Sequence, residues 1–321
     1  MGAYDQALAA AQRALALATA SGEVVLHARA TYYLGLTYQA QGDYRRAIDC
    51  FGQTVASLEG ARRFERFGQV FLPSVDSRAN LAVCHAELGM FAEGSALGEE
   101  GRRIAEAVDH PGSLMYAYYG IGLLALHQGD LPSALPRLER ALGICQDADL
   151  PFFFPRTAAA LGAAYTLDGR VADAVALLTQ ALAPTLATDM VYFQGLCHLA
   201  LGEAHLWAGR REEAYVYAER ALAHARERQE RSNQAYALRL RGEIAAQDAL
   251  HDVAEAAAAY HQALALAEEL GMRPLVAHCH RGLGTLYAAT GQREQARTAL
   301  SAAVDLYQAC LLYTSPSPRD S

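Results

Sequence analysis

The stretch LGLTYQAQGDYRRAIDCF, residues 34–51, contains a pattern that recurs along this 321-residue chain. From Gly42 onward it reads Gly-x-x-x-x-Ala, followed four places later by an apolar or aromatic residue and usually, three places further on, by a second Ala. The pattern begins at Gly2, Gly42, Gly89, Gly129, Gly169, Gly209 and Gly291, in steps of 40, 47, 40, 40, 40 and 82 residues. The double step leaves room for a copy at His251 that lacks the glycine. Self-similarity at this period predicts a solenoid of stacked repeats.

The residues before each glycine are equally regular. Seven places upstream lies a small residue, such as Gly35, and four places upstream lies an aromatic ring or a histidine in most copies, such as Tyr38. Apolar residues recur at spacings of three and four on both sides of the glycine, which is the helical period. The glycine ends the first helix, because a left-handed residue costs least there. Each unit therefore predicts two antiparallel helices of roughly 16–18 residues.

The complete unit, Leu-Gly-x-x-Tyr, a glycine turn and Ala-x-x-x-Phe/Leu-x-x-Ala, resembles the tetratricopeptide repeat. The resemblance implies an all-α fold of the tetratricopeptide-type α-solenoid class. We expect a right-handed superhelix of about seven antiparallel helix pairs, with about 15 helices, over residues 1–309.

Both ends of the chain depart from the repeat. Residues 1–20 carry only the second helix of a unit, so we expect that the sequence begins inside a longer protein and is a fragment. At the other end, the second helix of the last repeat is cut short, and we expect residues 310–321 to form a disordered tail without function. The final letters LLYTSPSPRDS resemble translated adapter sequence at the end of a metagenomic assembly, and a natural Ser/Pro-rich tail is the alternative.

The step of 47 residues contains an insertion near residues 61–75, which reads ARRFERFGQVFLPSV. It carries Phe64, Phe67 and Phe71. Aromatic residues in a linker are typical of a loop that folds back onto the solenoid. A loop that contacts a partner is the sharper alternative.

Composition narrows the class of protein. The formal net charge of −8 argues against a nucleic-acid partner. No apolar run approaches the ~20 residues of a membrane span and no signal peptide is found, so we expect a cytoplasmic protein without membrane contact. The six cysteines are scattered singly, which favours reduced, buried thiols; they are Cys50, Cys84, Cys145, Cys197, Cys279 and Cys310.

The sequence offers no catalytic motif. All 27 basic residues are arginine, so the lysine of a Walker A phosphate loop or of a Schiff-base enzyme is missing. His278 and His280 point about 200° apart on a helix, and His198 and His205 have no third ligand in view. We therefore expect no enzyme activity, no cofactor and no metal site. Some tetratricopeptide domains hold a chaperone's C-terminal carboxylate with lysines and asparagines on their first helices. This chain has no lysine and lacks the asparagines at the corresponding positions, which argues against such a clamp.

Two longer stretches give a narrower resemblance. Residues 65–94 (ERFGQVFLPSVDSRANLAVCHAELGMFAEG) and 261–297, with Gly-Met-Arg-Pro-Leu at 271–275, resemble the C-terminal repeat region of large bacterial signalling proteins. Those proteins join an adenylate/guanylate cyclase or another effector domain to an AAA-type predicted ATPase and then to tetratricopeptide repeats. The cyclase and ATPase domains are absent from this sequence, so neither activity transfers to it.

The repeat resemblance also implies where a partner binds, because the first helix of each pair lines the inner surface. The inner positions include Gln39, Asp76, Glu87, His127, Glu243 and His278, and the candidates for a protein-binding groove are Arg29, Tyr32, Tyr116, Tyr119, Arg156, Glu203, Trp207, Tyr236, Arg239 and Arg281. Aromatic residues and arginines are the usual anchors of interfaces. If the single tryptophan, Trp207, is such an anchor, Trp207→Ala should weaken partner binding by about 2 kcal/mol or more.

Three functions fit the sequence. The first is a non-catalytic protein-interaction and regulatory module of a larger signalling ATPase or cyclase, with a protein, a peptide or the parent protein's own domains as partner. The second is the repeat region of an ATPase-type transcriptional activator. The third is a small-molecule sensor in the concave groove, which requires a deep pocket with converging polar groups.

Overall fold

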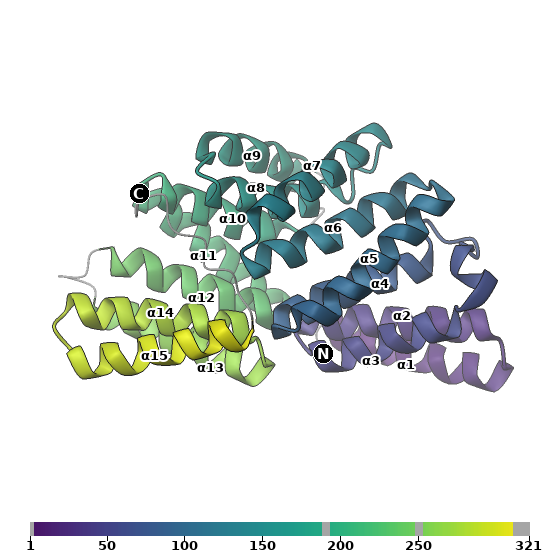
Figure 1. Cartoon of the computed structure of the whole chain (residues 1–321), viewed down its shortest axis with the longest axis horizontal. Helices are drawn as coiled ribbons and strands as arrows, with labels where there is room; N and C mark the ends of the chain where they lie inside the picture. Colours follow the sequence, from purple (N-terminus) through teal and green to yellow (C-terminus); the bar gives the residue numbers. More distant parts are fainter. Residues whose placement is uncertain (1–2, 188–192, 248–252, 311–321) are drawn as a thin grey trace.

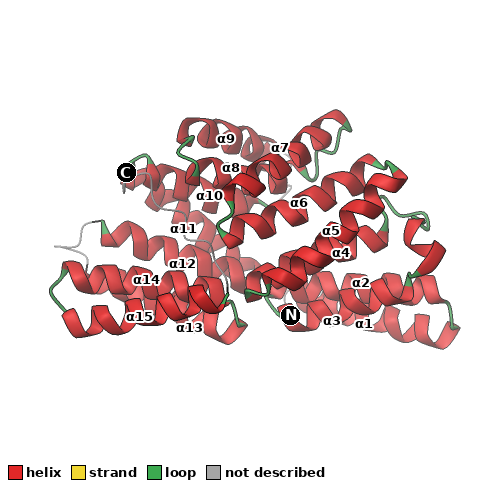
Figure 2. Cartoon of the chain, in the orientation of Figure 1, coloured by secondary structure: helices red, strands yellow, loops and turns green. Residues whose placement is uncertain are grey.

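The computed structural model describes residues 3–187, 193–247 and 253–310, which form helices joined by short turns. These residues contain 15 α-helices, one short 3₁₀ helix and no strand (Figure 2). In chain order the elements are α1 (Ala3–Ser21), α2 (Val24–Gln41), α3 (Tyr44–Ser57), η1 (Gly60–Phe64), α4 (Pro73–Leu88), α5 (Phe91–Val108), α6 (Pro111–Gln128), α7 (Leu131–Asp147), α8 (Phe154–Leu167), α9 (Val171–Ala187), α10 (Gln194–Trp207), α11 (Arg211–Arg228), α12 (Arg231–Ala246), α13 (Val253–Leu270), α14 (Arg273–Ala289) and α15 (Arg293–Ala309).

The helices after α1 form seven consecutive antiparallel pairs, from α2–α3 to α14–α15 (Figure 1). Each even-numbered helix is the first of its pair and packs against the first helices of neighbouring pairs, as α4 does against α6 and α8 against α10. This arrangement confirms the prediction of an all-α, tetratricopeptide-type solenoid.

The predicted turns lie where the glycine pattern places them. The six pattern glycines from Gly42 to Gly291 that the structure describes have φ values between 72° (Gly209) and 83° (Gly42), in the left-handed region. At Gly42 the turn is closed by its own N–H, which donates to the carbonyl of Gln39. Gly2 and His251 lie outside the described residues.

The small residue of each unit allows the two helices of a pair to approach closely. A Cβ atom at Gly162 in α8 would lie 2.7 Å from Leu178 Cγ in α9, which is closer than side chains tolerate. Leu178 is itself fully buried. The chain therefore needs glycine at this position for the pair to pack.

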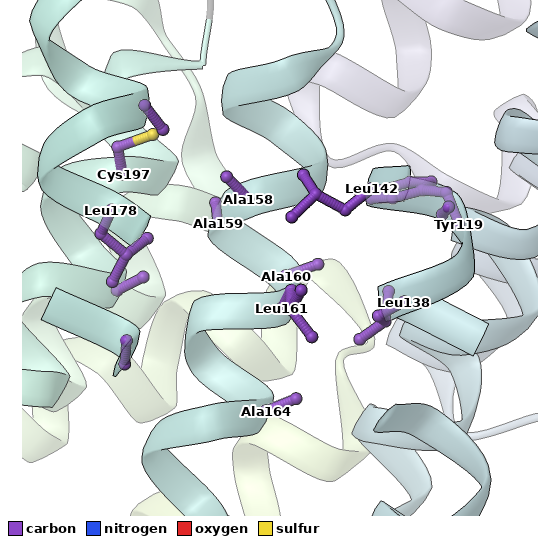
Figure 3. Close-up of a cluster of buried hydrophobic side chains, with 14 of the residues drawn as sticks. Tyr119, Leu138, Leu142, Ala158, Ala159, Ala160, Leu161, Ala164, Leu178 and Cys197 are labelled. Atoms are coloured by element: carbon purple, nitrogen blue, oxygen red, sulfur yellow. The ribbon is translucent and has the colours of Figure 1, made fainter. Parts of the chain in front are cut away.

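Side chains from successive pairs form a series of apolar clusters along the solenoid. In the middle of the chain, Leu138 of α7, Leu161 of α8 and Leu178 of α9 lie in the same cluster, with small alanines such as Ala158 and Ala164 between them (Figure 3). Cys197 of α10 also belongs to this cluster, and all six cysteines are buried.

The superhelix turns far enough for its last repeats to contact its first ones. Helix α12 packs against α2, and α14 packs against α4 (Figure 1). Leu270 Cδ1 lies 3.2 Å from a Cβ placed on Gly42, and Cys310 at the end of α15 is buried with Phe91 of α5. We call this contact between the ends of the solenoid the closure.

Candidate functional site

The inner helices surround a central cavity of about 1190 Å³. Its wall comes mainly from α1, α2, α4, α6, α8, α10 and α12, with Tyr44 of α3 and the segment between Phe67 and Pro73. Most of the wall is apolar or aromatic, and a few polar groups interrupt it. We treat this central cavity as the candidate functional site because it combines a large apolar surface with a small set of placed polar groups.

Five of the ten groove residues expected from the sequence line the central cavity. They are Arg29, Tyr32, Tyr116, Tyr119 and Arg156. The inner positions Gln39, Asp76 and Glu87 line it as well. The structure thus brings together residues from α2, α4, α6 and α8.

The other five expected residues lie elsewhere. Tyr236 lies at the closure, and Arg239 of α12 pairs with Glu203 of α10 and, at 2.5 Å, with Glu243. Arg281 is exposed on α14. Trp207 is 47% exposed at the end of α10 and is not a wall residue of the central cavity. Their role in partner binding stays a prediction.

Arg156 lies at one end of the cavity within a cluster of rings. Its Nη1 donates to the Tyr116 hydroxyl at 2.5 Å, and its guanidinium carbon lies 4.5 Å from the centroid of the Tyr119 ring. The Phe193 ring lies on a further side, 5.7 Å from the same carbon. Within the described residues, no carboxylate lies within ion-pair distance of Arg156. The rings therefore hold this cation in place without neutralising it.

Asp76, in the first turn of α4, is a buried carboxyl group on the cavity wall. Asp76 is only 6% exposed, and its Oδ1 atom accepts no hydrogen bond from any described residue. Burial raises the pKa of Asp76 well above its usual range, and the charge of Arg156 opposes this rise only in part. A buried polar atom without a partner costs about 1–3 kcal/mol, so such groups are rare in folded proteins.

Glu87, near the other end of α4, is also buried but has partners. The Tyr236 hydroxyl donates to Glu87 Oε2 at 2.8 Å, and His127 Nδ1 lies 4.0 Å from Oε1. Burial raises the pKa of Glu87, while His127 and the hydrogen bond from Tyr236 lower it. Because Tyr236 and Glu87 lie on α12 and α4, this bond also spans the closure.

The insertion after α3 folds back onto the solenoid, as its aromatic residues predicted. Phe71 is buried, and its ring stacks on Tyr116 with centroids 5.7 Å apart. Gln69 reaches Arg29, whose Nε and Nη1 donate to the amide oxygen at 3.2 and 3.1 Å in the amide orientation that satisfies both groups. Phe67 and Val70 line the cavity beside them. The insertion thereby forms part of the cavity wall.

Several wall residues were not anticipated from the repeat pattern. Tyr4 of α1 lines the cavity and donates to Glu230 Oε1 at 3.2 Å, which joins α1 to the turn between α11 and α12. Phe152 and Phe153 enter from the turn before α8. The unusual run Pro-Phe-Phe-Phe-Pro at residues 151–155 is the one signal in the sequence that could have pointed to them.

Two further observations concern metal binding and membrane crossing. In the part of the chain that the structure describes, no group of three His, Cys, Asp or Glu side chains could hold a metal ion. None of the described helices is long and apolar enough to cross a membrane.

Comparisons with known proteins agree with this fold. Tetratricopeptide repeat family models match residues 1–60 and 157–189. No curated protein matches the sequence.

Three solved structures resemble the whole solenoid. The Rap conjugation gene regulator of plasmid pLS20, in complex with the Phr* peptide, superposes with a TM-score of 0.70 at 17% identity, covering 92% of this chain and 77% of that chain. A Rap protein complexed with Competence and Sporulation Factor gives a TM-score of 0.69 at 12% identity, covering 89% and 76%. A signal transduction ATPase with numerous domains and a tetratricopeptide repeat sensor, from Pyrococcus horikoshii, gives 0.51 at 15% identity, covering 89% of this chain and 43% of that one. At these identities the likeness shows the fold alone.

Proposed function

We propose that this chain is a peptide-binding interaction module whose central cavity takes an extended peptide segment. The carrying observation is the cavity itself. Its volume of about 1190 Å³ exceeds the roughly 300–1,000 Å³ typical of sites for drug-sized ligands. Its wall offers rings at low entropy cost and arginines with forked donors, which are the groups that anchor peptides and proteins.

The comparisons support a peptide as the occupant. Two of the similar structures are described as complexes, one with the Phr* peptide and one with Competence and Sporulation Factor. Their solenoids cover most of this chain. Catalysis is not part of the proposal, because nothing in the cavity pairs a nucleophile with a base.

We further propose that the module regulates a larger bacterial signalling protein in the cytoplasm. The resemblance of residues 65–94 and 261–297 to cyclase- and ATPase-linked repeat regions supports this, as does the likeness to an ATPase with a tetratricopeptide repeat sensor. The partner then includes a peptide or the parent's own ATPase or effector domain, and not nucleic acid or a membrane, in line with the net charge of −8.

A selection experiment tests the proposal. The protein is incubated with a defined pool of hexapeptides, separated by rapid gel filtration, and the retained peptides are identified by mass spectrometry. Leu123→Trp places a large ring into the cavity wall and should abolish retention. Leu167→Trp adds the same ring at a position of α8 that is 41% exposed, and should retain the same peptides as the wild type.

Two outcomes would contradict peptide binding in the cavity. One is equal retention by wild type and Leu123→Trp while both remain folded, which would move the peptide to another surface. The other is no retained peptide at all. If native mass spectrometry then shows a small molecule that is lost in Leu123→Trp, the cavity is a small-molecule sensor instead.

A further inference from the structure

The buried and half-buried carboxylates of the inner surface differ in whether they have hydrogen-bond partners. Glu87 accepts a hydrogen bond from Tyr236, while Glu203 and Glu243 both pair with Arg239. Asp76 is the exception, because its Oδ1 atom has no donor among the described residues. It is also the one of these carboxylates that lies beside the ring cluster of the cavity.

The nearest cation does not satisfy Asp76. Arg156 acts on the Asp76 carboxyl electrostatically, yet it forms no ion pair with it. Its Nη1 is engaged by the Tyr116 hydroxyl, and its guanidinium is flanked by the rings of Tyr119 and Phe193. A shift of Arg156 towards Asp76 would break these contacts, so the carboxyl group remains available to a donor that enters through the cavity.

The surroundings of Asp76 favour a compact cation. The rings of Tyr32 and Tyr116 line the same part of the cavity, and Phe71 stacks on Tyr116. Ring faces attract cations, most strongly where water is excluded. Because Oδ1 is closed to solvent, a donor that enters through the cavity reaches the carboxyl group at its other oxygen, and a guanidinium fork cannot engage both oxygens side by side. An ammonium group needs to reach only one carboxylate oxygen. Its three N–H groups can be shared between that oxygen and the ring faces.

We propose that Asp76 receives a protonated amine of the bound peptide, which is either its free N-terminus or a lysine side chain. This inference rests on the proposed peptide-binding function and adds the chemistry of the ligand. The chain itself contains no lysine, so a lysine amine at this site must come from the partner. Burial raises the pKa of Asp76 and so favours its neutral carboxylic acid. When the ammonium group binds, the carboxyl group releases its proton, so the net charge of the buried site does not change.

The test uses four hexapeptide pools of otherwise identical composition. The first has a free N-terminus and no lysine, the second is N-acetylated with one lysine, the third is N-acetylated with norleucine in place of that lysine, and the fourth is N-acetylated with arginine there. Retention by the wild type should be at least tenfold greater for the first or the second pool than for the third. Whichever pool is retained identifies the source of the amine.

Two variants assign the effect to a residue. Asp76→Asn preserves shape and should reduce the preference for the amine pool at least tenfold. Glu243→Gln, the matched change in a carboxylate that pairs with Arg239 and lies outside the cavity wall, should keep it. Thermal unfolding followed by circular dichroism checks that both variants fold, and Asp76→Asn should melt no lower than the wild type because its carboxyl group is unpaired.

A second readout does not depend on variants. A carbodiimide joins a carboxyl group to an amine in contact with it, and the absence of lysine limits self-coupling of this chain to its N-terminus. Peptide mapping of the coupled complex should find the peptide amine linked at Asp76.

The outcomes separate this inference from the proposed function. Equal retention of the norleucine pool and the amine pools would overturn the role of Asp76 and leave peptide binding intact. Preferential retention of the arginine pool would replace the amine by a guanidinium and overturn the inference in the same way. Amine preference that persists in Asp76→Asn would likewise overturn the role of Asp76 and leave peptide binding intact. No retention of any pool would overturn the proposed function, and this inference with it.

Discussion

At the scale of single residues, Arg78 shows how a buried charge stabilises the solenoid. It is 1% exposed in α4, yet its guanidinium donates to Ser74 Oγ at 2.6 Å, to Glu59 at 3.3 Å and to Glu100 at 3.0 Å. Glu59 lies just before the insertion and Glu100 lies on α5. One side chain therefore ties the insertion and two helices together.

We expect Arg78→Met to lower the free energy of unfolding by about 2 kcal/mol, because hydrogen bonds to charged groups are each worth about 1.5–3 kcal/mol and Met preserves the packing. The hydrogen bond from Arg78 lowers the pKa of Glu100. A carboxyl group with a lowered folded pKa contributes stability above its unfolded pKa of about 4.3, and loses it as the pH falls through the folded value. The difference between wild type and variant in urea unfolding should therefore narrow below about pH 4.

The control for Arg78 is Arg297→Met, which removes a pair whose two side chains are 78% and 82% exposed. Such exposed pairs contribute little, so the change should stay within about 0.5 kcal/mol at every pH. A difference between wild type and Arg78→Met that persists unchanged to pH 3 would show that Glu100 is not its energetic partner.

At the scale of elements, the glycines of the helices divide into two classes. Gly162 in α8 faces Leu178, where a Cβ would lie within 2.9 Å of three side-chain atoms. Gly143 in α7 has nothing within 4 Å of the same position. We expect Gly162→Ala to destabilise the protein by about 1–3 kcal/mol through overpacking. Gly143→Ala should stabilise it by about 0.5–1 kcal/mol, since alanine is the better helix former. Thermal melting of the two variants should shift in opposite directions, and equal shifts would refute the close packing at Gly162.

Most of what could be predicted from the sequence concerns the helices and the turns between them. The helix pairs and the left-handed turns at Gly42 and Gly129 could be predicted, because each repeat contains both the glycine that forms its turn and the small residue at which its two helices meet. Inner positions counted back from those turns placed Tyr116 and Arg156 on the cavity wall. The same count places Trp207 near the rim of the groove, and the structure has it 47% exposed at the end of α10, outside the cavity wall.

At the scale of the whole molecule, the period of about 40 residues says nothing about how far the superhelix turns. That depends on small rotations between neighbouring repeats, which add up along the chain. The closure was therefore not predictable, and neither was the bond from Tyr236 to Glu87 across 149 positions. The closure reaches the site through α12, whose Ser232 and Asn233 line the central cavity together with residues of α1 and α2.

The closure can be tested with an engineered disulfide. A Cβ at position 89 would lie 3.5 Å from Cys310 Cβ and 2.7 Å from its Sγ, and disulfides have Cβ–Cβ distances of about 3.5–4.5 Å. We expect Gly89→Cys to form a bond with Cys310 under mild oxidation. The bond closes a long loop, worth about 5 kcal/mol at most by loss of chain entropy, and the left-handed φ of 74° at residue 89 costs about 1–2 kcal/mol. A net gain of up to about 3–4 kcal/mol should appear as a raised melting temperature that is lost with reductant.

The control is Gly169→Cys, which has the same left-handed turn and no atom within 4 Å of its Cβ. It should carry the conformational cost alone, melt below the wild type and show no response to reductant. Burial raises the pKa of the Cys310 thiol, so the oxidation is carried out at mildly alkaline pH, where more thiolate is present. Mass spectrometry that finds residue 89 and Cys310 unlinked in the oxidised protein would show that the first and last repeats are not held together in solution. The cavity would then be an open groove, and Tyr236 would be free of Glu87 and available to a partner.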